Sequence, residues 1–187
     1  MIRLYNRTRH PDGPIRDALA HAARAIGVRG DVVVKVTPSR RQFPGAYVRR
    51  EFPCLGFLRG VRGREGRDGR LVGDRPGFAV LSLPARSKDW LEACWWFMRT
   101  AIHEMAHVRQ IREGRYGELR LREALRTGSH SRRMRHDSRP CEVDAWDQVD
   151  DAGRDKRRYL RQQDATIDMA LAIEEVEGAR GGYGAVR

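Results

Sequence analysis

A five-residue motif, His103-Glu104-Met105-Ala106-His107, carries the clearest chemistry in the chain. In an α-helix, residues four apart lie one above the other on one face, so both imidazoles can bind a single metal ion. Glu104 lies about 100° round the helix, at the edge of that face, where its carboxylate can reach a metal-bound water. Neutral imidazoles bind zinc well. Zinc in turn lowers the pKa of a bound water molecule towards ~7, so that a nearby carboxylate can accept its proton. The motif predicts a zinc site with Glu104 as general base.

A catalytic zinc takes three protein ligands and keeps one position open, so a third ligand must come from elsewhere. We favour Glu142, because it opens a predicted helix after Pro140, and a carboxylate on a rigid helix holds its geometry better than a loop histidine. On a helix Glu142 and Asp144 point about 200° apart, so only one of them can ligate. The full set of candidates is His130, His136, Asp137, Glu142 and Asp144.

Together the two segments resemble the gluzincin metallopeptidases, in which HExxH is followed by ExxA on a second helix. HEMAHVRQ and RPCEVDA are similar to segments of small bacterial and phage proteins of this type, over about residues 78–150. The resemblance implies zinc bound by His103, His107 and Glu142, with Glu104 as the base. It also implies that the strand FAVLSLP edges the cleft, where an extended peptide substrate adds as a further strand.

The chain departs from the gluzincin pattern at one position. Many gluzincins carry Asp four residues after the glutamate ligand, where it supports a zinc histidine, and this chain has Trp146 there. Asp144 and Asp147 have the wrong helical phase for the same contact, so the supporting residue is open. The group that stabilises the oxyanion is open among Tyr116, His130, His136, Arg139 and Tyr159.

A rival interpretation takes His130 as the third ligand. DNA-associated proteases of the SprT-like kind place a third histidine in a loop after HExxH, and the segment GSHS around His130 is similar to that loop. The net charge of +12 favours polyanions such as nucleic acid as partners. However, Lys35, Lys88 and Lys156 are the only lysines among 37 basic residues, an arginine skew that a GC-rich genome also produces.

Composition limits the remaining classes. With 187 residues, 40% of them hydrophobic and 33% charged, the chain is expected to form one folded domain. The longest apolar run, Ala93–Met98, has six residues, whereas a bilayer span needs ~20. The first residues contain no apolar signal region, so we expect a cytoplasmic protein without membrane association. Cys54, Cys94 and Cys141 form no CxxC pair, which excludes a disulfide scaffold.

The order of helix, strands and then helices predicts an α+β fold, with a short antiparallel or mixed sheet packed on the HExxH helix and a second ligand-bearing helix. The single domain 1–187 is divided into an N-terminal helix and sheet (14–84), zinc-binding helices (87–151) and a C-terminal helix (154–178). Predicted elements are helices 14–27, 87–113 (capped by Ser87), 117–126, 140–151 and 154–177, strands 31–38, 45–52 and 78–84, and loops 56–77 and 128–140.

These observations predict a zinc metallopeptidase that hydrolyses a peptide bond, with an intracellular protein or peptide as substrate. A different class is the alternative: a basic nucleic-acid-associated protein, either a SprT-like protease or a binding protein with an inert metal site. Salt dependence separates them, because binding to phosphates weakens steeply with salt whereas peptide cleavage depends on the metal.

Overall fold

The computed structural model describes residues 1–39, 77–113, 115, 119 and 138–182. The predicted strand 45–52, the predicted helix 117–126 apart from residue 119, and nearly all of the two predicted loops lie outside these residues. The described helices and strands are β1 (Ile2–Asn6), α1 (Asp12–Ile26), β2 (Val32–Ser39), β3 (Gly77–Pro84), α2 (Trp90–Arg112), α4 (Pro140–Arg154) and α5 (Lys156–Gly182).

The sheet has three strands in the order β1-β2-β3, and both pairs are parallel. The prediction of a fold that mixes helices and strands is confirmed, but the prediction of an antiparallel or mixed sheet is wrong. One of the two parallel pairs, β2 with β3, joins strands that the sequence predicted; the other involves β1, which the sequence analysis missed. Because α1 carries the chain back after β1, β2 re-enters the sheet parallel to it. The alternation of apolar and polar residues in Ile2-Arg3-Leu4 was the available sequence signal for β1, and the structure half-buries Ile2 and Leu4 and exposes Arg3.

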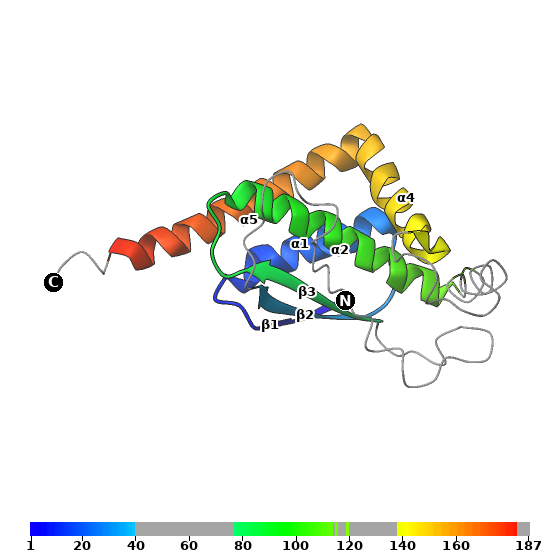
Figure 1. Ribbon diagram of the computed structural model, residues 1–187, viewed down its shortest axis with the longest axis horizontal. Coiled ribbons are helices and arrows are strands. Elements are labelled where there is room, and N and C mark those ends of the chain that lie inside the picture. The colour runs from blue at the N-terminus through cyan, green and yellow to red at the C-terminus, as the bar shows by residue number, and fades with distance from the viewer. Residues whose placement is uncertain (40–76, 114, 116–118, 120–137, 183–187) are drawn as a thin grey trace.

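One face of the sheet is buried against the helices (Figure 1). Register places Val32 beside Ile2 and Val34 beside both Leu4 and Ala79, so alternate residues of all three strands share that face. The buried strand residues join apolar side chains of α1 and α2 in one core. Those of the strands are Val32, Val34, Val36, Ala79, Leu81 and Leu83.

Helix α2 lies at the centre of the molecule and packs against β3, α1, α4 and α5. It begins at Trp90 because Asp89 caps it: the Asp89 carboxylate accepts the backbone N–H of Glu92 at 2.8 Å. The predicted cap, Ser87, instead hydrogen-bonds the backbone of Asp89. Apolar residues at helical spacing predict one buried face of α2, and the structure buries all of them except Leu91, which is 51% exposed. They are Leu91, Cys94, Met98, Ile102 and Met105.

Helix α5 buries a different face from the expected one. The apolar residues of the sequence predict that Leu160, Ile167 and Leu171 point inward, but these side chains are 44–58% exposed. The buried residues follow helical spacing but include polar ones, so counting apolar side chains selected the wrong face. They are Gln162, Thr166, Met169, Ala170 and Ile173. In the part of the chain that is described, no helix is long and apolar enough to cross a membrane.

Candidate metal centre

Two packed helices bring together the three predicted ligands. His103 and His107 lie one turn apart on α2, and Glu142 lies in the first turn of α4. The two imidazole Nε2 atoms are 3.1 Å apart, and the Glu142 Oε2 atom lies 3.1 Å from that of His103 and 3.2 Å from that of His107. All three side chains are buried. Among the described residues they form a group able to hold a metal ion.

The triangle of donor atoms fits a tetrahedral ion. With bonds of ~2.0–2.1 Å, two ligands of tetrahedral zinc are separated by about 3.3 Å. The three observed separations, 3.1, 3.1 and 3.2 Å, are close to that value. Two imidazole nitrogens and one carboxylate oxygen are also a donor set that zinc accepts, and three protein ligands leave a fourth position for water or substrate.

Electrostatics keep the Glu142 carboxylate of this triangle ionised. Burial acts to raise the pKa of Glu142, but hydrogen bonds and charge from His103 and His107 outweigh it and hold that pKa well below its ordinary value. Burial acts to lower the pKa of His107, yet the contact with Glu142 raises it overall. Without metal, the carboxylate therefore stays ionised and favours a proton on His107. Metal binding displaces such a proton.

Gln110 is the residue that supports a candidate zinc histidine. Its Oε1 atom lies 2.9 Å from His107 Nδ1, and its amide NH₂ donates to the Cys141 carbonyl at 3.0 Å and to Asp144 at 2.7 Å. Because the NH₂ group faces two acceptors, the amide oxygen faces His107 and accepts the Nδ1 proton. In a neutral imidazole this leaves the lone pair on Nε2, the atom that faces Glu142.

Asp144 belongs to this supporting network and is not among the grouped ligands. Its carboxylate also accepts the Gln148 amide at 2.8 Å and pairs with Arg115. The Asp144 alternative for the third ligand is therefore not supported. Sequence reasoning placed Gln110 on a face near the histidines but gave it no role; its position three residues after His107, one helical turn on, was the signal.

Trp146 occupies the position at which many gluzincins carry Asp. Its ring centroid lies 4.4 Å from that of His103, with 39° between the planes. The indole thus restrains the imidazole by packing, where a carboxylate would restrain it by a hydrogen bond. The Arg99 guanidinium lies 6.0 Å from the same indole, on which it can stack as a cation.

Glu104 lies beside the triangle and is buried, with 3% of its surface exposed. Burial raises its pKa to about 7, with the charge of His107 opposing and that of Glu142 adding to the shift. Its Oε2 atom is buried and accepts no hydrogen bond from the described residues. A carboxyl group with a pKa near neutrality and an unfilled acceptor atom is suited to receive a proton.

Of the other candidates for the third ligand or the oxyanion-stabilising group, two lie in the described part of the chain and the rest do not. Tyr159 is on α5, where its hydroxyl accepts the Gln163 amide at 3.1 Å and its ring packs edge-on against Trp95. The contacts of Tyr159 thus lie within α5 and with α2. Arg139 is the residue before α4. Tyr116, His130, His136 and Asp137 lie outside the described residues.

Comparison with known proteins adds no relative. No protein-family model, curated protein or solved structure matches this chain. The resemblance to gluzincins accordingly stands on the two motifs alone, beside the triangle of ligands that α2 and α4 form.

Proposed function

We propose that this protein is a zinc-dependent peptidase. The observation that carries the proposal is the convergence of His103 Nε2, His107 Nε2 and Glu142 Oε2 within 3.2 Å of one another, next to the buried Glu104. A purely structural zinc site usually has four protein ligands rich in cysteine. Three ligands, a fourth open position and an adjacent carboxyl group match a hydrolytic site better.

When bound, zinc supplies an activated water and polarises the scissile carbonyl. Glu104 would act as the base, accepting a proton from the attacking water and passing it to the leaving amine. A pKa of about 7 suits both transfers, because the same carboxyl group must take up and give back a proton near neutral pH. His103, held by Trp146, and His107, held by Gln110, keep the ligand geometry constant through the reaction.

The sheet supports a peptide as substrate. In the described sheet, β3 is the last strand in the order β1-β2-β3, and it packs directly against α2, the helix that carries the motif. An extended segment can pair with such a strand through main-chain hydrogen bonds. We propose that an extended protein segment binds along β3, with its scissile bond next to Glu104.

Metal analysis and a matched base variant test the proposal. We expect one zinc per chain in the purified protein, and cleavage of members of a peptide library that stops on chelation and returns with zinc. Glu104→Gln keeps size and hydrogen bonding but cannot accept a proton, so it should retain zinc and fold while cleavage falls ~10²-fold or more.

Two outcomes would reject the peptidase. The first is a Glu104→Gln variant that cleaves at the parent's rate, because the proposed base would then be idle. The second is a zinc-loaded parent that cleaves neither itself nor any peptide of the library.

A further inference from the structure

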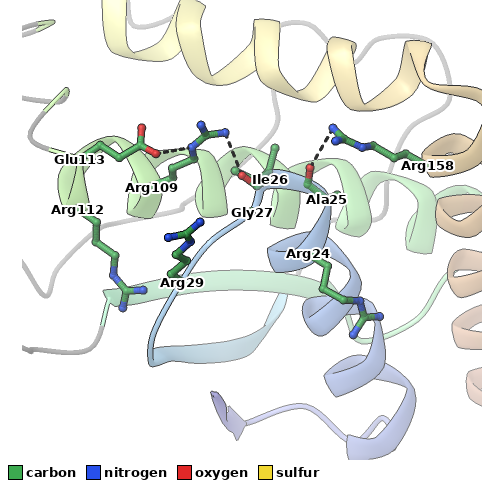
Figure 2. A pocket seen from close by; sticks show the side chains of 9 residues that line it. All are labelled: Arg24, Ala25, Ile26, Gly27, Arg29, Arg109, Arg112, Glu113 and Arg158. Carbon is green, nitrogen blue, oxygen red and sulfur yellow. Dashed lines mark hydrogen bonds and ion pairs between the residues drawn. The ribbon is translucent and has the colours of Figure 1, made fainter.

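A basic cleft lies at the end of α1, apart from the metal centre. Its volume is about 640 Å³, and its walls come from α1, the turn after it, α2 and α5 (Figure 2). Five of its lining residues are arginines and one is a glutamate, which gives a lining charge of +4. The arginines are Arg24, Arg29, Arg109, Arg112 and Arg158.

Two of these arginines have a structural task. Helix α1 ends at Gly27, whose φ of 71° is left-handed and reverses the chain, so the last carbonyls of the helix need donors. Arg109 donates to the Ile26 carbonyl at 3.0 Å, and Arg158 to that of Ala25 at 3.5 Å. Their positive charge also suits the negative end of the helix dipole.

The other three arginines, Arg24, Arg29 and Arg112, do not bond the last carbonyls of α1. The side chains of Arg24 and Arg29 are exposed and form no hydrogen bond or ion pair within the described residues. Arg112 donates to the Asp31 carbonyl, yet its Nη1 atom is buried without a partner among those residues. The one lining carboxylate, Glu113, is paired with Arg109 at 2.7 Å. The cleft therefore holds more cationic donors than its own walls can satisfy.

We propose that this cleft binds backbone phosphates of a nucleic acid. The planar guanidinium matches phosphate oxygens with two parallel hydrogen bonds, and several such groups around one cleft can hold successive phosphates. A chain charge of +12 extends the attraction along a polyanion beyond the cleft itself. These two properties favour a nucleic acid over a small phosphate compound.

The cleft is separate from the proposed peptidase site. On α2, Arg109 follows His107 by two residues and so points about 200° away from it. Nucleic acid bound in the cleft would therefore contact a different face of α2 from the one that carries the metal ligands. The inference does not rest on the peptidase, and each can fail without the other.

Fluorescence anisotropy with labelled duplex and single-stranded DNA of ~20 nucleotides tests the cleft. Arg24→Gln combined with Arg29→Gln removes two charges that support no described contact, so folding should be retained. We expect the Kd to rise about 10-fold or more near 0.1 M salt. The plot of log association constant against log salt concentration should become less steep, its slope decreasing in magnitude by about 2 for duplex DNA.

The matched control is Arg7→Gln combined with Arg86→Gln. Both arginines are exposed and follow β1 and β3, at the carboxyl edge of the sheet, whereas the cleft adjoins the amino end of β2. This control loses the same charge, and we expect its Kd to stay within about threefold of the parent's, since no cleft contact is lost. Both double variants should keep the parent's circular dichroism spectrum.

Three results would overturn the proposal. Equal weakening by both double variants would show diffuse attraction and no cleft site. Failure of the parent to bind either oligonucleotide at low salt would exclude nucleic acid. Cleft-dependent binding of inorganic pyrophosphate without oligonucleotide binding would identify a small phosphate ligand instead. The Kd should be the same in zinc-loaded and chelated protein, which separates this test from that of the peptidase.

Discussion

His107 connects two sets of side chains. Through Nε2 it meets His103 and Glu142, and through Nδ1 it meets Gln110. The proton of a neutral imidazole can reside on only one nitrogen, so the Gln110 contact decides which nitrogen is left to bind metal. At this scale, the chemistry of the proposed site depends on where single protons reside.

The third ligand gives the first prediction at the residue scale. Glu142→Ala removes the only carboxylate of the triangle, so the variant should lose stoichiometric zinc, measured by elemental analysis after dialysis against a weak chelator. His130→Ala and His136→Ala should each keep one zinc per chain. Zinc retained by Glu142→Ala but lost from His130→Ala would favour the SprT-like interpretation instead.

At the element scale, the site depends on the packing of α4 against α2. Gln110 joins these helices, because its amide bonds the Cys141 carbonyl in the first turn of α4 and Asp144 one turn further on. This places Glu142 opposite the histidines. The histidine support that gluzincins take from an Asp on the second helix comes here from the HExxH helix itself.

Gln110→Leu tests that support. The variant leaves His107 Nδ1 without its acceptor, so we expect zinc affinity to fall about 10- to 100-fold, measured by competition with a chromophoric chelator. Gln148→Leu is the matched control, because Gln148 also donates to Asp144 but does not touch His107. An equal loss of affinity in both variants would mean that the contact with Asp144, and not the one with His107, accounts for the effect of Gln110.

At the scale of the whole molecule, positive charge gathers around the C-terminal half of α1. Burial lowers the pKa of His21, and the charges of Arg24 and Arg161 lower it further. The folded protein therefore disfavours protonated His21, whereas the unfolded chain protonates it near the ordinary pKa of about 6.5. At pH values between the lowered pKa of the folded protein and about 6.5, His21 binds more protons in the unfolded state than in the folded state.

Folding stability should consequently fall as pH drops below about 6.5, by at most ~1.4 kcal/mol per pH unit from this one group. His21→Gln cannot titrate and should remove that part of the slope. Denaturant unfolding of the parent and of His21→Gln from pH 7 to 5, in the presence of a chelator, measures the difference in their free energies of unfolding. The titration of the metal ligands is common to both proteins and cancels in this difference. Parallel stability profiles for the two proteins would show that His21 is not the sensitive group.

The candidate metal-binding triad of this protein was predictable from its sequence. The spacing of His103 and His107 places both on one face of any helix, because helical geometry relates residues four apart whatever surrounds them. The choice of Glu142 followed from its position at the start of a predicted helix, and the structure brings it within 3.2 Å of both histidines.

Tertiary structure decided what depends on residues far apart in the chain. Whether Glu142 or Asp144 faces the histidines is set by the rotation of α4 against α2, across 35 or more residues of sequence. The parallel pairing of β2 with β3 joins strands that are distant in sequence, and β1 is a short strand that is stable only when paired with β2. The arginine cleft likewise forms only where α1, α2 and α5 meet, since periodicity describes one helix and not the meeting of three.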